Sequence, residues 1–199
     1  KVLSPHPVAT STTFELIDRA TDFYCCNPWD LLRSAIPPRV ATVDKELQVV
    51  DQPSSSAKAK RTSSYESFIP FAPPHEQIGE IVAEFNRSGS VLIVAPDERD
   101  VDKLIENLSG RFDNILKLSS ASTREERYRN FLLSMRLEFS VVVGTRSSIF
   151  TPVRNLAAII IYKESSPDHF ELRSPGWNSS TIAYMRAEKE GVVLVLTGF

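Results

Sequence analysis

Tyr162 to Ser165 follow an unbroken apolar run, Leu156 to Ile161, that contains three consecutive isoleucines. Such a run is typical of a strand that is buried on both faces of a parallel sheet. Ligands of these sheets bind just beyond the carboxyl ends of the strands. A nucleotide hydrolase needs acidic residues at this place, to bind a metal ion and to position water. This chain has Tyr162, Lys163, Glu164 and Ser165 there instead.

The turn before the first helix of the predicted sheet, within residues 67 to 77, is where a phosphate-binding loop would lie. Such a loop has the pattern G-x-x-x-x-G-K-[ST], in which glycines let backbone N–H groups surround a phosphate and the lysine neutralises it. The segment SFIPFAPPHEQ has no glycine and no lysine. Its prolines, among them Pro73 and Pro74, have no N–H group to donate. The sequence therefore predicts that this turn binds no phosphate.

A second candidate site is the segment from Gly144 to Ser147, which follows another predicted strand. Gly144 permits a close approach of the backbone. Thr145, Arg146 and Ser147 offer hydroxyl groups, N–H groups and a guanidinium, which are groups that contact DNA phosphates. The alternative is a turn that only connects two layers of the fold, with Arg146 paired to an acid.

Two further groups favour ordinary surface roles. Arg124, Arg127 and Arg129 could face a polyanion, but the glutamates between them are typical of a solvated helix face. Asp168 and His169 have no nucleophile spaced to complete a catalytic triad. We therefore expect His169 to be a surface histidine whose hydrogen bonds are satisfied.

The elements that must position these residues alternate between helix and strand from Phe68 onwards. Apolar runs predict five strands, and the segments between them have helical periodicity. This alternation predicts an α/β fold with a parallel sheet and helices on both of its faces. The runs are SVLIVAP, NILKLSS, FSVVVG, LAAIIIY and VVLVLTGF.

The rest of the chain differs from this pattern. Residues 1–47 predict a short helical segment, in which Phe14, Ile17 and Tyr24 recur at helical spacing. Residues 48–66 have almost no apolar content, which predicts a flexible linker before the sheet domain at 67–199. Because the chain starts at Lys1 and stops directly after an apolar run, we expect it to be a piece of a longer protein.

The composition narrows the classes of function. The net charge of −2 gives no general argument for nucleic-acid binding, so such a surface must be a local patch. The only cysteines are the adjacent Cys25 and Cys26, which excludes a disulfide framework and fits a reducing compartment. Two cysteines and three scattered histidines make a four-ligand zinc site improbable. No apolar run approaches the length of a membrane span, so we expect a cytoplasmic protein.

Read in order, these segments resemble the PriA family of bacterial replication-restart helicases, also called primosomal protein N′. The resemblance covers nearly the whole chain. Residues 2–39 are similar to the end of the family's N-terminal DNA-binding domain, and residues 91–104 to the second strand and helix of its first helicase lobe. The most specific segment is VVVGTRSSIFTPVRNLAAIII, at 141–161, which is similar to the family's V-V-I-G-T-R-S-A-L-F-x-P-x-x-N-L-x-x-I-I-V.

The resemblance implies a RecA-like lobe, but the chain departs from it where the family binds and hydrolyses ATP. The family's phosphate loop falls on FIPFAPPH, which includes Pro73 and Pro74. Its D-E-E-H box falls on YKES, where only Glu164 keeps its type, and its S-A-T motif falls on TGF. Similar degeneration occurs in the actinobacterial branch of the family. We therefore expect no catalytic residue and no ATP or Mg²⁺ in this chain, and the family's zinc segment lies beyond Phe199.

The resemblance implies a function in replication restart, by binding branched or forked DNA together with other primosome proteins near the nucleoid. Gly144, Thr145, Arg146 and Ser147 are its candidate DNA contacts. Two alternatives stay open at this point. One is a protein-interaction module that kept the helicase fold, and the other is an unorthodox ATP-dependent 3′–5′ DNA helicase.

Overall fold

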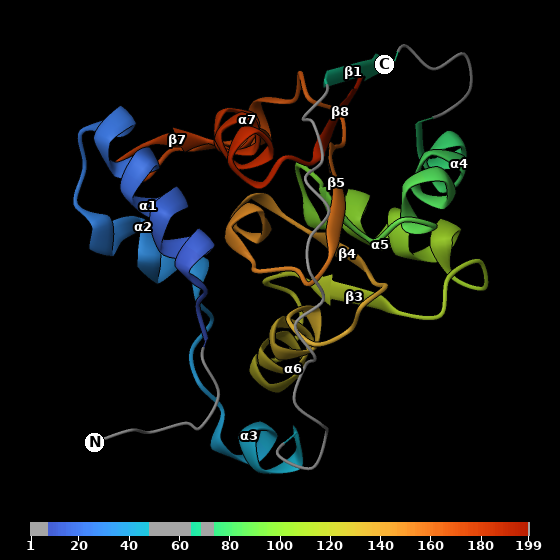
Figure 1. Ribbon diagram of the computed structural model, residues 1–199, viewed down its shortest axis with the longest axis horizontal. Helices are drawn as coiled ribbons and strands as arrows, with labels where there is room; N and C mark the ends of the chain where they lie inside the picture. Colours follow the sequence, from blue (N-terminus) through green and yellow to red (C-terminus); the bar gives the residue numbers. More distant parts are fainter. Residues whose placement is uncertain (1–7, 48–64, 69–73, 199) are drawn as a thin grey trace.

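A sheet of six parallel strands lies at the centre of the protein, for which a computed structural model describes residues 8–47, 65–68 and 74–198 (Figure 1). The strand order is β1-β8-β5-β2-β4-β3, and each neighbouring pair is parallel. The predicted α/β fold class is confirmed. The strands are β1 (Tyr65–Phe68), β2 (Ser90–Val94), β3 (Ile115–Leu118), β4 (Val141–Gly144), β5 (Leu156–Ile161) and β8 (Val193–Thr197).

Strand β1 is the one that the sequence did not predict. It lies at the edge of the sheet and pairs with β8. It begins at Tyr65, inside the segment 48–66 that was expected to be a linker, so the sheet starts two residues before the predicted boundary at 67. Residues 48–64 lie outside the described part of the chain.

The central strands β2 and β5 are buried along their whole length. Their alternate residues enter two separate hydrophobic clusters, because successive side chains of a strand point to opposite faces. In β2, Val91 and Ile93 belong to one cluster, and Leu92 and Val94 belong to the other. Both faces of the sheet are therefore covered, which explains why these strands read as continuous apolar runs.

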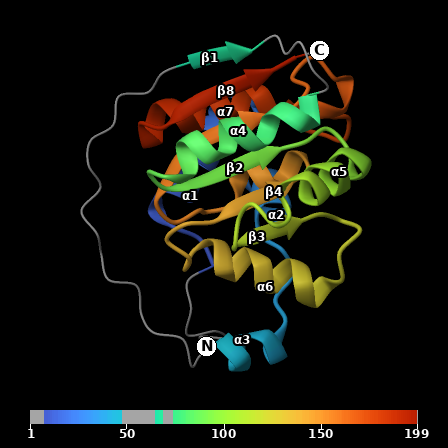
Figure 2. The same cartoon turned by 90° about the vertical axis from the view of Figure 1, so that its right-hand side faces the viewer.

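Helices cover both faces of the sheet. Helices α4 (Pro74–Asn86) and α5 (Glu98–Leu108) cover one face and lie in front of the sheet in Figure 2. Helices α6 (Arg124–Ser134) and α7 (Ser179–Glu190) pack on the other face. Each of α5, α6 and α7 begins at a side-chain cap, from Asp97, Thr123 and Asn178 respectively, as the polar residues before each apolar pattern indicate.

The N-terminal helices pack outside the face of the sheet that α6 and α7 cover, the first beside α7 and the third beside α6. They are α1 (Ser11–Tyr24), α2 (Pro28–Ala35) and α3 (Ala41–Leu47). Leu16, Ile17 and Leu31 are buried in the same hydrophobic cluster as Phe150 and Ile182 of the sheet domain. Residues 1–47 were expected to be the end of a separate domain, yet their described helices share one core with the sheet.

A polar contact joins α3 to α6. The Asp44 carboxylate accepts a hydrogen bond of 2.8 Å from the Tyr128 hydroxyl and one of 2.6 Å from Arg39 Nε. Asp44 is buried, and both of its oxygens have partners, as a buried carboxylate requires. This contact fixes the helix before the undescribed segment 48–64 against the sheet domain.

The chain leaves β5 in a turn and forms a small hairpin before α7. A short 3₁₀ helix, Pro167–His169, leads into β6 (Phe170–Glu171), which pairs with β7 (Trp177–Asn178) in an antiparallel manner. Trp177 is buried and packs edge to face on Phe150, with 5.2 Å between the ring centroids. None of the helices in the described ranges is long and apolar enough to cross a membrane.

Candidate functional site at the carboxyl edge of the sheet

The carboxyl ends of β2, β4, β5 and β8 meet at one edge of the sheet and are joined there by backbone hydrogen bonds. Tyr162 N–H donates to Val94 O at 2.9 Å, and Ala95 N–H donates to Gly144 O at 2.8 Å. Glu164 N–H donates to Thr197 O at 2.8 Å. The predicted site residues after β4 and after β5 therefore lie on the same edge, as the parallel sheet requires.

Lys163 forms an ion pair at the position where an NTPase needs an acidic metal ligand. Its Nζ lies 2.7 Å from Asp100 Oδ1, and Asp100 comes from the first turn of α5. The two side chains are 21% and 8% exposed. Lys163 has a left-handed backbone with a φ of 53°, and its N–H donates to Thr197 Oγ1. The chain thus places a cation of its own against the Asp100 carboxylate at this part of the edge.

Tyr162 is buried beneath that ion pair. The Lys163 ammonium lies 5.4 Å from the centroid of the Tyr162 ring. Burial, together with the negative charge of Asp100, raises the pKa of the Tyr162 hydroxyl to about 12. The phenol is therefore neutral at physiological pH. It contributes packing where the D-E-E-H box of the resembling family has its first acid.

His169 is buried, contrary to the expectation of a surface histidine. A neutral ring satisfies both of its contacts when Nε2–H donates to Tyr162 O at 2.9 Å and Nδ1 accepts from Ser179 Oγ at 2.8 Å. Burial lowers the pKa of His169, and the bond to the Tyr162 carbonyl opposes that change only in part. The polar residues before His169 and the exposed Phe170 after it gave no apolar pattern to indicate that the ring is buried.

The other residues at the degenerate ATP positions do not assemble a phosphate-binding turn in the described chain. Pro74 is the first residue of α4, and the prediction for Pro73 lies outside the described residues. Glu164 is partly exposed and Ser165 is exposed. No group of three His, Cys, Asp or Glu side chains within the described ranges is arranged to hold a metal ion.

The candidate DNA segment begins at Gly144, which only glycine can occupy without a shift of the backbone. A Cβ at this position would lie 2.4 Å from Leu118 O and 2.7 Å from Ser148 Cβ. The chain then enters a 3₁₀ helix, Arg146–Phe150, whose first residue is preceded by Thr145. Ser147 is exposed. Gly144, Thr145 and Ser147 therefore lie together beside the end of β3.

Arg146 turns away towards the β6–β7 hairpin. Its Nη1 donates to Asp168 O at 2.7 Å, and its Nη2 lies 3.3 Å from Glu171 Oε2. The side chains of Arg146 and Glu171 are 31% and 25% exposed. This pairing with an acid is the alternative that the sequence left open for Arg146. The hairpin was not predicted, because each of its strands has only two residues.

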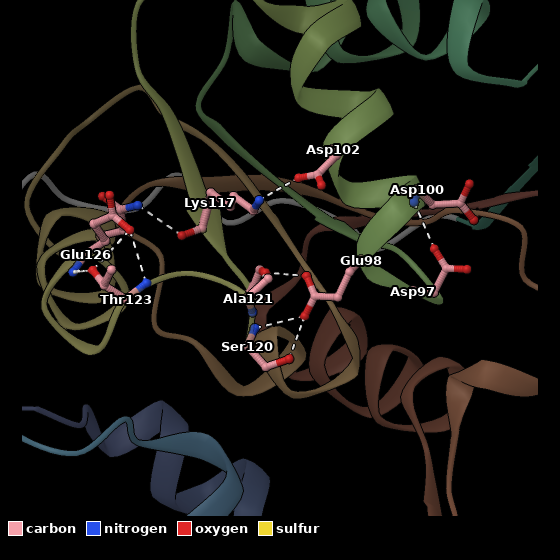
Figure 3. A network of polar contacts seen from close by, with 11 residues as sticks. Asp97, Glu98, Asp100, Asp102, Lys117, Ser120, Ala121, Thr123 and Glu126 are labelled. Carbon is pink, nitrogen blue, oxygen red and sulfur yellow. Dashed lines mark hydrogen bonds and ion pairs between the residues drawn. The ribbon is translucent and has the colours of Figure 1, made fainter.

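Glu98 is a residue at this edge that sequence reasoning missed (Figure 3). It lies in the first turn of α5, and its carboxylate accepts from Ser120 N–H at 2.9 Å and from Ser120 Oγ at 2.6 Å, with a further contact to Ser119 Oγ. Although burial raises the pKa of Glu98, these hydrogen bonds outweigh burial and lower it. The acid-rich start of the predicted helix, DERD, was the available signal. Glu98 holds the loop after β3 in a fixed place beside Gly144.

Known proteins with similar sequences are named for replication restart. No family model matches the chain. A protein named probable replication restart protein PriA, from Mycobacterium tuberculosis strain H37Rv, is 26% identical over 223 residues, a match that covers 100% of this chain and 34% of that protein. The replication restart protein PriA of Synechocystis is 31% identical over 109 residues, covering 54% of this chain and 13% of that protein.

Among solved structures, the Escherichia coli DEAH/RHA helicase HrpB has the same fold in its matching part. Its TM-score is 0.50 at 16% sequence identity, over 71% of this chain and 20% of that one. The sheet and its helices are thus a RecA-like lobe. The match to the mycobacterial relatives covers the whole of this chain. It covers about a third of the length of those relatives. Along its whole length the chain is similar to proteins named probable replication restart protein PriA.

Proposed function

We propose that this chain acts in the restart of DNA replication as a DNA-binding, helicase-like lobe that does not hydrolyse ATP. The names of its relatives and its RecA-like fold support a function in replication restart. The relatives extend well beyond this chain, so the proposal concerns the contribution of this lobe. Branched or forked DNA and other primosome proteins are its proposed partners, in the cytoplasm at the nucleoid.

The ion pair between Lys163 and Asp100 carries the proposal that ATP is not hydrolysed. Magnesium binds through carboxylates and phosphate oxygens. The ammonium of Lys163 neutralises Asp100 and would repel a divalent cation brought near it. Together with the proline-rich sequence before α4, these residues do not fit Mg²⁺ and ATP. We derive no hydrolytic step for this lobe.

The segment Gly144 to Ser147 is our proposed contact with DNA. Thr145 and Ser147 offer hydroxyl groups beside the end of β4. Arg146 would exchange Glu171 for a DNA phosphate, because a partly exposed ion pair contributes only about 0–1 kcal/mol and is easily replaced. The bond from Arg146 to the Asp168 carbonyl could persist during this exchange, since a guanidinium has five N–H donors.

Two binding measurements on the 199-residue chain test this proposal. Calorimetry with millimolar ATP and Mg²⁺ should detect no binding. A dissociation constant in the micromolar range corresponds to about 8 kcal/mol, which the residues at the degenerate ATP positions have no donors to supply. If such an affinity were found and were lost in Glu164→Gln, the chain would be an ATP-dependent enzyme after all.

The second measurement is binding to forked and to linear DNA of equal length across a range of salt concentrations. We expect tighter binding to the fork and an affinity that falls as salt increases, since phosphate contacts release counterions. A folded chain that binds neither DNA at low salt would instead support the protein-interaction module.

A further inference from the structure

A pocket of about 140 Å³ lies on the other side of the β4 loop from the Lys163–Asp100 ion pair. Its walls come from three parts of the chain, which are the end of α2, the loop after β3 with α6, and the loop after β4. None of the residues at the degenerate ATP positions lines it. The lining residues are Arg33 to Pro38, Leu118 to Ser120, Arg127, Phe131, Thr145, Ser147, Ser148 and Thr151.

The lining combines positive charge with hydroxyl groups. Arg33 and Arg127 supply two guanidinium groups, and five serines and two threonines supply the hydroxyls. No acidic residue is among them. Two carboxylates contact the lining from outside it. Asp30 lies 3.5 Å from Arg33, and Glu98 accepts hydrogen bonds from Ser119 and Ser120. The remaining donors face a space that suits an anion.

Two of the lining groups are buried donors without a partner among the described residues. They are Ser148 Oγ and Arg127 Nε. Ser148 is 2% exposed, and Arg127 forms no ion pair within the described chain. Most buried polar groups in native proteins have a hydrogen-bond partner, because leaving one unpaired is unfavourable. A ligand that accepts hydrogen bonds from both groups would satisfy them.

We propose that this pocket binds one phosphate group, with Arg127 and Ser148 as its principal donors. Phosphate is compact, carries several acceptor oxygens and forms its strongest hydrogen bonds with guanidinium groups. The group could be a free phosphate or belong to the backbone of DNA. If the group belongs to DNA, the pocket extends the DNA-binding function proposed above, and the assignment to DNA rests on that function.

The test is a titration of the ¹⁵N-labelled chain with inorganic phosphate at constant ionic strength, followed by two-dimensional NMR. We expect saturable shifts at the Arg127 Nε–H signal and at the amides of residues 145–148. Ser148→Ala should weaken binding about fivefold, as the loss of one hydrogen bond of average strength implies. Arg127→Gln should weaken it at least about tenfold, because the lost bond is charge-assisted.

Ser180→Ala is the matched control. Ser180 Oγ is also buried and without a partner among the described residues, but it does not line the pocket. This variant should bind phosphate like the parent chain. Shifts that do not saturate, or that persist unchanged in both Ser148→Ala and Arg127→Gln, would overturn the proposal. Because Ser148→Ala removes only one oxygen, we expect this variant to fold. It therefore tests the pocket even if Arg127→Gln does not fold.

Addition of a single-stranded oligonucleotide without terminal phosphates identifies the source of the group. If it displaces inorganic phosphate from the pocket, the ligand is a backbone phosphate, and if it does not, the ligand is a free phosphate. Phosphate binding in a chain that binds no DNA would support the phosphate pocket and contradict the proposed DNA-binding function. If the chain binds DNA equally well in both variants but binds no phosphate, the DNA-binding function is supported and the phosphate pocket is contradicted.

Discussion

The loops after β5 and after β4 lie on the same edge of the sheet but satisfy their polar groups in opposite ways. After β5, Lys163 pairs with Asp100 and His169 bonds to both Tyr162 and Ser179. After β4, Ser148 Oγ has no partner in the described chain and lies in a pocket. A polar edge of a RecA-like sheet is thus no evidence of a ligand site by itself. What distinguishes the two loops is whether the chain supplies the counter-charges and acceptors from its own residues.

Breaking the ion pair after β5 should have the largest effect. Lys163→Met leaves the Asp100 carboxylate, whose side chain is 8% exposed, without its cation. We expect a loss of about 3 kcal/mol in the free energy of unfolding, as for other broken buried pairs. Urea denaturation measures this quantity. The control is Lys103→Met on the exposed surface of α5, which should change stability by less than about 0.5 kcal/mol. Equal stability of both variants would mean that the loop after β5 does not depend on its own counter-ion.

Adding a side chain at Gly144, where the backbone lies close to Leu118, should have the second-largest effect on stability. Gly144→Ala places a Cβ against the Leu118 carbonyl, which is backbone and cannot move aside easily. We expect a loss of about 2 kcal/mol, together with weaker binding at the adjacent pocket. Gly79→Ala is the matched control, because its Cβ would meet only the flexible end of the Arg111 side chain. Thermal denaturation of both variants checks the result, and a Gly144→Ala variant as stable as the control would contradict the close packing.

The buried histidine predicts a pH dependence that belongs to the loop after β5 alone. Because burial lowers the pKa of His169, the folded state resists protonation. The stability from this neutral ring is therefore complete above the unfolded pKa, about 6.5, and decreases as the pH falls towards the lower folded pKa. The difference in stability between the parent chain and His169→Gln should shrink from pH 7.5 to pH 5. A constant difference for His169→Gln would show that the ring does not titrate with folding.

The smallest effects should come from the Arg146–Glu171 pair, which joins the two loops. If Arg146 exchanges Glu171 for a DNA phosphate, Arg146→Ala lowers the slope of log affinity against log salt by about one unit. Glu171→Gln then strengthens DNA binding, since it removes the competing acceptor. If the pair is only structural, both variants lose up to about 1 kcal/mol of stability and leave the slope unchanged. Fluorescence anisotropy with a forked DNA distinguishes these outcomes.

The sequence predicted the interior of this fold well because its signals there are local. The central strands β2, β4 and β5 are buried along their whole length and read as unbroken apolar runs, and polar caps mark the starts of the helices. Strand β1 escaped prediction because YESF is short, half polar and follows a segment with little apolar content. An edge strand is defined by its pairing with β8, which four residues cannot reveal.

The side-chain partners at the site were harder to predict, because they are separated along the chain. Lys163 and Asp100 are 63 residues apart, and Arg146 and Glu171 are 25 apart. Charge patterns indicate that an arginine needs a partner but not which acid the fold will bring to it. His169 was misplaced for the same reason, since its burial depends on α7 and on a hairpin that no local pattern indicates.

The core that α1 and α2 share with the sheet domain has a consequence for how the chain is made. Leu31 is buried in the same cluster as Ile182, so the first helices complete their packing only after α7 has been synthesised. At a translation rate of about 5–20 residues per second, that interval lasts roughly ten seconds or more. During this time the apolar faces of α1 and α2 remain open on the ribosome. Helices α1 and α2 are thus translated before α7 but complete their packing only with it, and a chain interrupted before α7 would expose them to aggregation.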